Sequence, residues 1–148
     1  MDKQIEEIEQ LFTEFIPLYH KKLSLIFRKD DEDMEYKCNK NQKRAILLIR
    51  KERGVILSEL GRYLDLRKGS LTSLIDSLER AGLVERRLDK QDRRKTKLFL
   101  TAAGEEYYQQ IMLQSKRTYY KLFSKLPKEE IEKCRNGLKD VVSVLKIL

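Results

Sequence analysis

Residues 55–100, VILSELGRYLDLRKGSLTSLIDSLERAGLVERRLDKQDRRKTKLFL, decide the fold of this chain. Apolar residues recur at helical spacing over residues 59–64 and 68–81, with a turn between the two stretches. Two extended segments follow, residues 83–87 and 96–100, and the polar loop that joins them predicts a hairpin. A helix–turn–helix followed by a hairpin can place a helix in one groove of DNA and a loop in a neighbouring groove.

The second of these helices carries an apolar stripe of Leu71, Leu74, Ile75 and Leu78, and its other faces are small and rich in hydroxyl groups. Such faces permit close approach to a phosphate backbone and hydrogen bonds to base edges. The alternative is an ordinary solvated surface, although a chain this charged would be expected to place more Lys and Glu there. The predicted DNA-contacting residues of this helix are Lys68, Gly69, Ser70, Thr72, Ser73 and Ser77.

The hairpin is strongly basic, with seven basic and three acidic residues from Glu85 to Lys97. Charges also protect an exposed edge strand from aggregation, so a solvated edge is the alternative interpretation. Two adjacent arginines near the tip favour DNA, because guanidinium groups suit the narrow, electronegative minor groove. The predicted DNA-contacting residues of the hairpin are Arg86, Lys90, Asp92, Arg93, Arg94 and Lys95.

The net charge of +8 is concentrated in the middle of the chain. Residues 1–36 carry a balance of −5, residues 37–100 of +10 and residues 101–148 of +3. This distribution indicates a localised phosphate-binding face, and we expect double-stranded DNA as the partner. The 148-residue length suits one domain, and no apolar stretch is long enough to span a membrane. We therefore expect a cytoplasmic protein.

Helices are predicted on both sides of the central stretch. The first runs from Gln4 to about Arg28 with a kink at Pro17, and an acidic loop follows it. The next begins with Asn41 as N-cap and ends at Arg53-Gly54, and Ser58 caps the short helix after it.

Two further helices are predicted after the hairpin. Thr101 caps the first, and Pro127 occupies the first turn of the last one. The expected fold is mainly α with a small β-hairpin wing. One domain would cover residues 1–148, with a DNA-binding lobe at 41–100 and a dimerisation lobe formed by 1–36 with 101–148.

No group of residues in the sequence indicates a catalytic site. The chain lacks a His–carboxylate set, a nucleophile elbow, a phosphate-cradling loop and clustered metal ligands, so we expect neither an enzyme nor a bound metal or cofactor. Cys38, beside Lys37, is a candidate redox sensor with a lowered thiol pKa, and an ordinary partly exposed thiol is the alternative. Cys134 fits a helix core and His20 a packing role.

The sequence resembles the MarR family of winged helix–turn–helix regulators over most of its length. The similarity is densest in LTSLIDSLERAGLVERRLDKQDRRKTKLFLTAAGEE, which contains Gly82-Leu83-Val84, Asp92-Arg93-Arg94 and Leu100-Thr101-Ala102-Ala103-Gly104 in the order and spacing of the family pattern. The resemblance implies a homodimer that binds a near-palindromic operator, with recognition helices in successive major grooves and wings in the flanking minor grooves. Arg94 would enter the minor groove and Asp92 would help to position the loop.

Two features of the family do not transfer directly. Ser73 stands where many relatives carry a larger side chain, so base preference is not implied, and no cysteine precedes Cys38, which argues against a peroxide sensor in the first helix. The resemblance also implies control by a small phenolic or other anionic effector. The resulting hypothesis is a sequence-specific repressor, and the alternative is a winged-helix adaptor that binds proteins without sequence-specific DNA binding.

Overall fold

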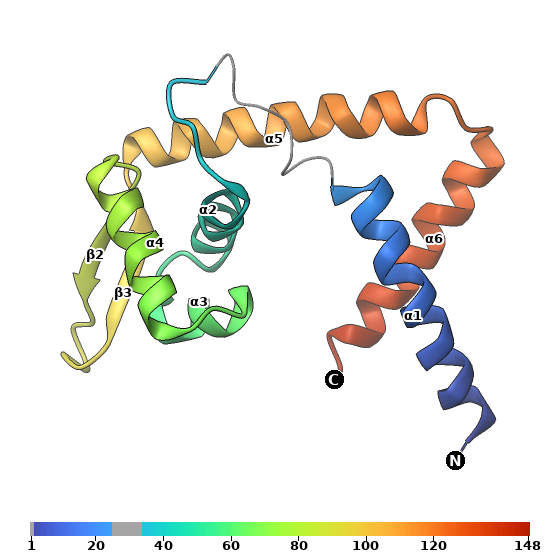
Figure 1. Ribbon diagram of the computed structural model, residues 1–148, viewed down its shortest axis with the longest axis horizontal. Helices are drawn as coiled ribbons and strands as arrows, with labels where there is room; N and C mark the ends of the chain where they lie inside the picture. Colours follow the sequence, from blue (N-terminus) through green and yellow to red (C-terminus); the bar gives the residue numbers. More distant parts are fainter. Residues whose placement is uncertain (1, 25–33) are drawn as a thin grey trace. The chain divides into compact units, whose positions relative to one another are not determined.

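The computed structural model describes residues 2–24 and 34–148. Within them the chain forms six helices and a three-stranded antiparallel sheet, which confirms the predicted mainly α fold with a small β wing (Figure 1). The elements are α1 (Lys3–Lys22), α2 (Lys40–Glu52), β1 (Val55–Ile56), α3 (Leu57–Leu64), α4 (Lys68–Arg80), β2 (Val84–Leu88), β3 (Thr96–Leu100), α5 (Ala102–Phe123) and α6 (Lys128–Leu145). The chain divides into two compact units, residues 1–114 and 115–148.

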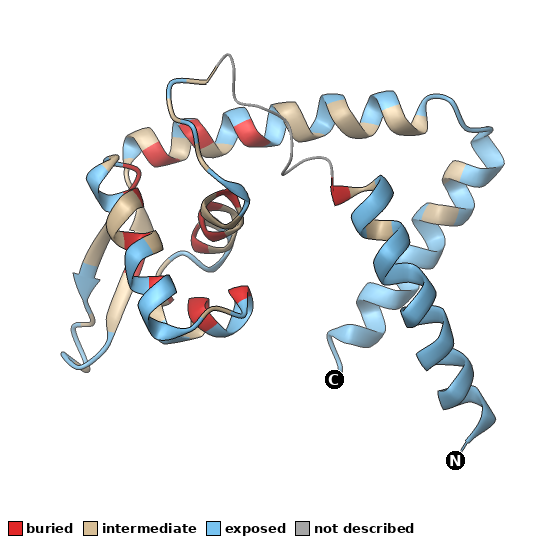
Figure 2. Cartoon of the chain, viewed as in Figure 1, coloured by how far each residue is buried: buried red, intermediate tan, exposed pale blue. Residues whose placement is uncertain are grey.

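The apolar core of the described residues lies within the first unit. It is built from α2, α3, α4, the strands and the first half of α5, where the buried residues gather (Figure 2). The predicted stripe of α4 contributes Leu71, Ile75 and Leu78 to this core, whereas Leu74 is half-buried. Tyr107 and Ile111 bring α5 into the same core. The position of α4 is therefore fixed by contacts along one whole side.

The sheet contains one strand more than the expected hairpin. The predicted pair β2 and β3 is present, and the extended piece after α2 adds β1 on the other side of β3, giving the order β1-β3-β2. Val55 of β1 pairs with Leu98, and Arg86 of β2 pairs with the same residue. Both edges of β3 are thus hydrogen-bonded, which anchors the base of the wing in the lobe.

The start of α2 lies two residues before the predicted position. Asn39, not Asn41, is the N-cap, because its side chain accepts a hydrogen bond from Gln42 N while the Gln42 side chain accepts one from Asn39 N. Such a reciprocal capping box satisfies two helix-end donors at once. Asn41 lies inside the helix instead.

Three other helix ends also differ from the prediction. Ser58 is not a cap, because α3 already begins at Leu57, and Pro127 is the N-cap of α6 rather than its first residue. Helix α1 contains Pro17 as expected, but it ends at Lys22 with Leu23 as its C-cap, whereas the predicted end was about Arg28. The segment 25–33, which holds four of the five acidic residues of the predicted loop, lies outside the described residues.

The exit of α4 and the entry of α5 are joined through backbone contacts. Gly82 has φ +73, a left-handed conformation that ends α4 and favours glycine. The Thr101 hydroxyl donates to Gly82 O at 2.5 Å and accepts from Gly104 N at 3.0 Å, so Thr101 caps α5 as predicted. A Cβ on residue 104 would lie 2.0 Å from Leu83 O. Only glycine at 104 allows this approach.

Substitution of Gly104 by Ala should therefore destabilise the lobe by about 1–3 kcal/mol, because the added methyl overlaps a backbone carbonyl that cannot rotate away. Gly69→Ala is the matched control, since nothing lies within 4 Å of the added Cβ near the start of α4. Its stability should be unchanged or raised by the better helix propensity of alanine. Equal denaturant midpoints for the two variants would contradict the close contact.

Candidate nucleic-acid interface

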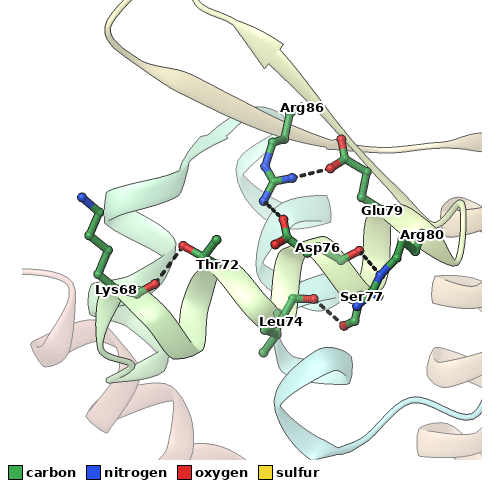
Figure 3. Close-up of polar contacts among 8 residues, drawn as sticks. All are labelled: Lys68, Thr72, Leu74, Asp76, Ser77, Glu79, Arg80 and Arg86. Carbon is green, nitrogen blue, oxygen red and sulfur yellow. Dashed lines mark hydrogen bonds and ion pairs between the residues drawn. The ribbon is translucent and has the colours of Figure 1, made fainter.

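The outward face of α4 is polar and small. Helix α4 follows the left-handed residue Asp65, with φ +53, which reverses the chain after α3. Five of the six residues predicted from this helix are exposed together near its beginning, namely Lys68, Gly69, Ser70, Thr72 and Ser73. The Thr72 hydroxyl donates to Lys68 O at 2.9 Å and can still accept a hydrogen bond (Figure 3). This face offers hydroxyl groups, one cation and no bulky side chain.

Ser77, the sixth predicted residue, is placed differently. It is half-buried, and its hydroxyl donates to Leu74 O at 2.6 Å (Figure 3). The same hydroxyl accepts a hydrogen bond from Gln42 Nε2 at 2.8 Å. The bond from Gln42 ties α4 to α2, whereas the bond to Leu74 lies within α4. Ser77 therefore helps to hold α4 in position and is not part of its outward polar face.

Arg86 is turned toward α4 rather than toward the wing tip. Its Nη2 lies 2.6 Å from Asp76 Oδ1, and its Nη1 donates to Glu79 (Figure 3). The alternation of β2 explains this direction, because Arg86 shares a sheet face with the buried residues Val84 and Leu98. Charge-assisted hydrogen bonds of this kind are directional, so they fix the angle between the wing and α4.

The wing tip is organised by a residue that the sequence analysis missed. Asp89 Oδ1 accepts hydrogen bonds from Gln91 N at 2.8 Å and Asp92 N at 2.9 Å, and its Oδ2 lies 2.5 Å from Lys97 Nζ. Asp92 then accepts from Arg94 N at 3.1 Å, which agrees with a positioning role. An aspartate followed by polar residues at a strand end is a known turn signal and could have pointed to Asp89.

These bonds change the acidity of the turn. The pKa of the Asp89 carboxyl is lowered to about 2, first by the hydrogen bond from Lys97 and then by the backbone N–H groups of Asp92 and Gln91. The carboxylate is therefore charged and internally satisfied at neutral pH.

The cations of the wing remain available. Lys90, Arg93, Arg94 and Lys95 are all exposed. Within the described residues, only Lys95 of these four has an ion-pair contact, with Asp92 at 4.0 Å. The tip therefore uses its carboxylates to shape the loop and presents its positive charge outward, as an anionic ligand requires.

A cavity of about 370 Å³ between α3 and α4 extends the basic surface. Its polar lining consists of Arg62, Lys68, Asp65 and the hydroxyl-bearing Ser58 and Thr72. Cations and hydroxyls at one cavity can hold a phosphate oxygen by charge and hydrogen bonds. Arg62 was not singled out from the sequence, because its position in a short amphipathic helix gives no sign of what its neighbours in α4 supply.

The redox role predicted for Cys38 stays a prediction. Cys38 is half-buried and packs against the core just before α2, and Cys134 is half-buried on α6. In the part of the chain that the structure describes, no group of three potential ligands could hold a metal ion. The described helices include none that is long and apolar enough to cross a membrane.

Comparison with known proteins agrees with this geometry. Residues 39–96 match the model of the MarR family. These residues contain a MarR-family domain. The HTH-type transcriptional regulator PapX of Escherichia coli is 34% identical over 89 residues, which are 60% of this chain and 54% of PapX. The chain thus spans about half or less of the curated relatives that it matches.

Solved structures show the same fold over almost the full chain. Wild-type MarR from E. coli superposes with a TM-score of 0.75 at 22% identity, covering 87% of this chain and 95% of MarR. Streptococcus pneumoniae FabT in complex with DNA superposes with a TM-score of 0.66 at 24% identity, covering 98% of both chains. The MarR-family domain therefore lies in a chain whose described helices and strands follow the MarR fold.

The Asp89 carboxyl should titrate near pH 2 in a carboxyl-detected NMR experiment, instead of near its ordinary value of 3.8. Because the folded-state pKa is depressed, the stabilisation is present above about pH 4 and is lost as the pH falls through about 2. Lys97→Met should raise the titration midpoint, whereas Lys90→Met, on the same loop without this contact, should not. An ordinary midpoint in the parent protein would contradict the turn described above.

Proposed function

We propose that this protein is a sequence-specific DNA-binding transcriptional regulator. In this proposal α4 enters the major groove with Lys68, Gly69, Ser70, Thr72 and Ser73 toward the bases and backbone, while the wing enters the flanking minor groove. The observation that carries it is the fixed juxtaposition of a small polar helix face and an outward-facing cationic loop, held together by Arg86. DNA in the structure of FabT, a protein of the same fold, supports it.

The wing supplies the charge for this contact. Arg93 and Arg94 lie at the exposed tip, and guanidinium groups are favoured where the minor groove is narrow and electronegative. Lys90 and Lys95 flank them and suit phosphate contacts. We assign Arg86 and Ser77 supporting roles instead, because their polar atoms are bonded within the lobe.

The active form would be a homodimer on a near-palindromic operator. None of the residues of α1 or α6 is buried, and both helices carry long apolar rows. In α1 these exposed residues include Ile5, Ile8, Phe12, Phe15 and Ile16, and in α6 they include Leu138, Val141, Val142 and Leu145. Apolar surface of this extent calls for a partner, and a second copy would place two α4 helices at a fixed spacing.

The proposed role is regulatory rather than catalytic, since the matched relatives are named transcriptional regulators. Occupation of an operator by a dimer would block transcription, so we propose a cytoplasmic repressor, with release by a small anionic or phenolic effector. A protein adaptor with the same fold would show no preference for one DNA sequence over another. Selection of bound DNA from a random pool separates these two functions.

Arg94→Ala should weaken binding to the selected site by about tenfold or more, because it removes a minor-groove cation from the centre of the wing contact. Lys51→Ala, which removes one exposed cation from the end of α2, is the matched control and should have little effect. Binding by the parent protein should fall steeply with salt and saturate at two chains per site. Selection without any consensus, or equal affinities of Arg94→Ala and the parent, would refute the assignment.

A further inference from the structure

Leu88 is an exposed apolar residue in the basic wing. It is the only apolar residue from Glu85 to Lys97, a stretch that contains seven basic residues. Its side chain is 65% exposed, and it is not among the described residues that form or pack against the apolar core. Single exposed leucines are common on protein surfaces, so the position of this one decides what it means.

The backbone at Leu88 is held on both sides. Leu88 ends β2 and pairs with Thr96, the first residue of β3. The next residue closes the turn, because Asp89 N donates to Lys95 O at 2.9 Å and the Asp89 carboxylate accepts from backbone N–H groups further along the loop. The leucine is therefore presented at a fixed place, so little conformational freedom is lost when it binds a partner.

Leu88 lies on the sheet face that is turned toward α4. Successive strand residues alternate between faces, so Leu88 shares its face with Arg86 and with Leu98 of β3. Arg86 is bonded to Asp76 and Glu79 of α4 (Figure 3). Leu88 follows Arg86 on this face in the direction of the turn, so it lies between the bridge to α4 and the exposed cations of the wing tip.

The dimensions of a two-stranded wing place this position at the mouth of a minor groove and not at its floor. Paired strands lie about 4.8 Å apart before their side chains are counted, and the minor groove of B-DNA is about 6 Å wide. Only the side chains of the tip can therefore enter the groove, and the last paired residues stop at its edge. The walls at that edge consist of deoxyribose rings, whose carbon–hydrogen faces offer an apolar surface.

We propose that Leu88 packs against the deoxyribose wall of the minor groove and sets how deeply the wing tip enters. This inference rests on the proposed function, and it adds a contact that is neither a base contact nor an ion pair. Cations that bind phosphates release counterions from DNA, whereas an apolar contact releases none. The contribution of Leu88 therefore differs from that of the neighbouring cations in its dependence on salt.

Leu88→Ala in the full chain should weaken binding to the selected DNA site by about fivefold, since the lost contact covers part of one leucine side chain. The slope of log affinity against log salt should stay that of the parent, whereas Arg94→Ala should reduce the slope by about one. Leu88→Met keeps an apolar side chain of similar volume and should bind as the parent does. The thermal midpoint of Leu88→Ala should match the parent because the side chain is mostly exposed.

Hydroxyl-radical cleavage of the bound DNA locates the contact, because the radical attacks deoxyribose hydrogens that line the minor groove. The parent should protect sugars beside the wing, and Leu88→Ala should lose this protection while the rest of the site stays protected. Parent-like affinity and protection in Leu88→Ala would overturn this inference alone. A salt slope reduced as in Arg94→Ala, or a lowered thermal midpoint, would do the same. A parent protein that selects no DNA sequence would overturn the proposed function as well.

Discussion

The ion pairs of Arg86 join the two parts of the surface that is proposed to face DNA. Arg86 leaves the base of the wing and contacts both Asp76 and Glu79 on α4, so the strand that carries the wing and the helix beside it share one orientation. A helix and a loop that read adjacent grooves must keep a fixed separation, since base and phosphate positions are set by the duplex.

Other contacts support the same arrangement from different directions. Gln42 and Ser77 fasten α4 to α2, and the contact of Gly104 with Leu83 fixes the point where α4 gives way to β2. At the far end of the wing, Asp89 closes the turn with backbone N–H groups and Lys97. Acidic side chains are thus used within the lobe, and the exposed cations are left for an anionic partner. This division explains how a strongly basic segment can be ordered while its cations stay exposed.

The sequence predicted the long elements correctly because their periodic patterns are local. The α4 stripe, the hairpin, Gly82 and the Thr101 cap all follow from residue spacing and turn chemistry. Contacts between distant segments were not predictable in this way. The pairing of β1 with β3 depends on the final position of α2, and the direction of Arg86 depends on acids ten and seven residues earlier in the chain.

In the candidate site, too, the roles of single residues depend on contacts that the sequence pattern did not predict. Composition predicted a basic wing, and Lys90, Arg93, Arg94 and Lys95 are exposed, while their contact with DNA stays a prediction. Composition could not distinguish the exposed cations of the wing from Arg86, which pairs with acids of α4. Nor could it distinguish the exposed hydroxyls of α4 from that of Ser77, which is hydrogen-bonded within the protein. These distinctions arise from packing, because the same residue type can satisfy a neighbour or remain available to a ligand.

The most direct test of this account is a double-mutant cycle on the specificity ratio, the affinity for the selected site divided by that for random DNA. The cycle compares Arg86→Gln, the pair Asp76→Asn with Glu79→Gln, and all three changes together. If the bridge positions the wing, each arm lowers the ratio by about tenfold and the triple variant is no worse than Arg86→Gln alone. If Arg86 instead contacts DNA phosphate, its loss weakens specific and random binding equally and the acid substitutions strengthen both, which would contradict the account.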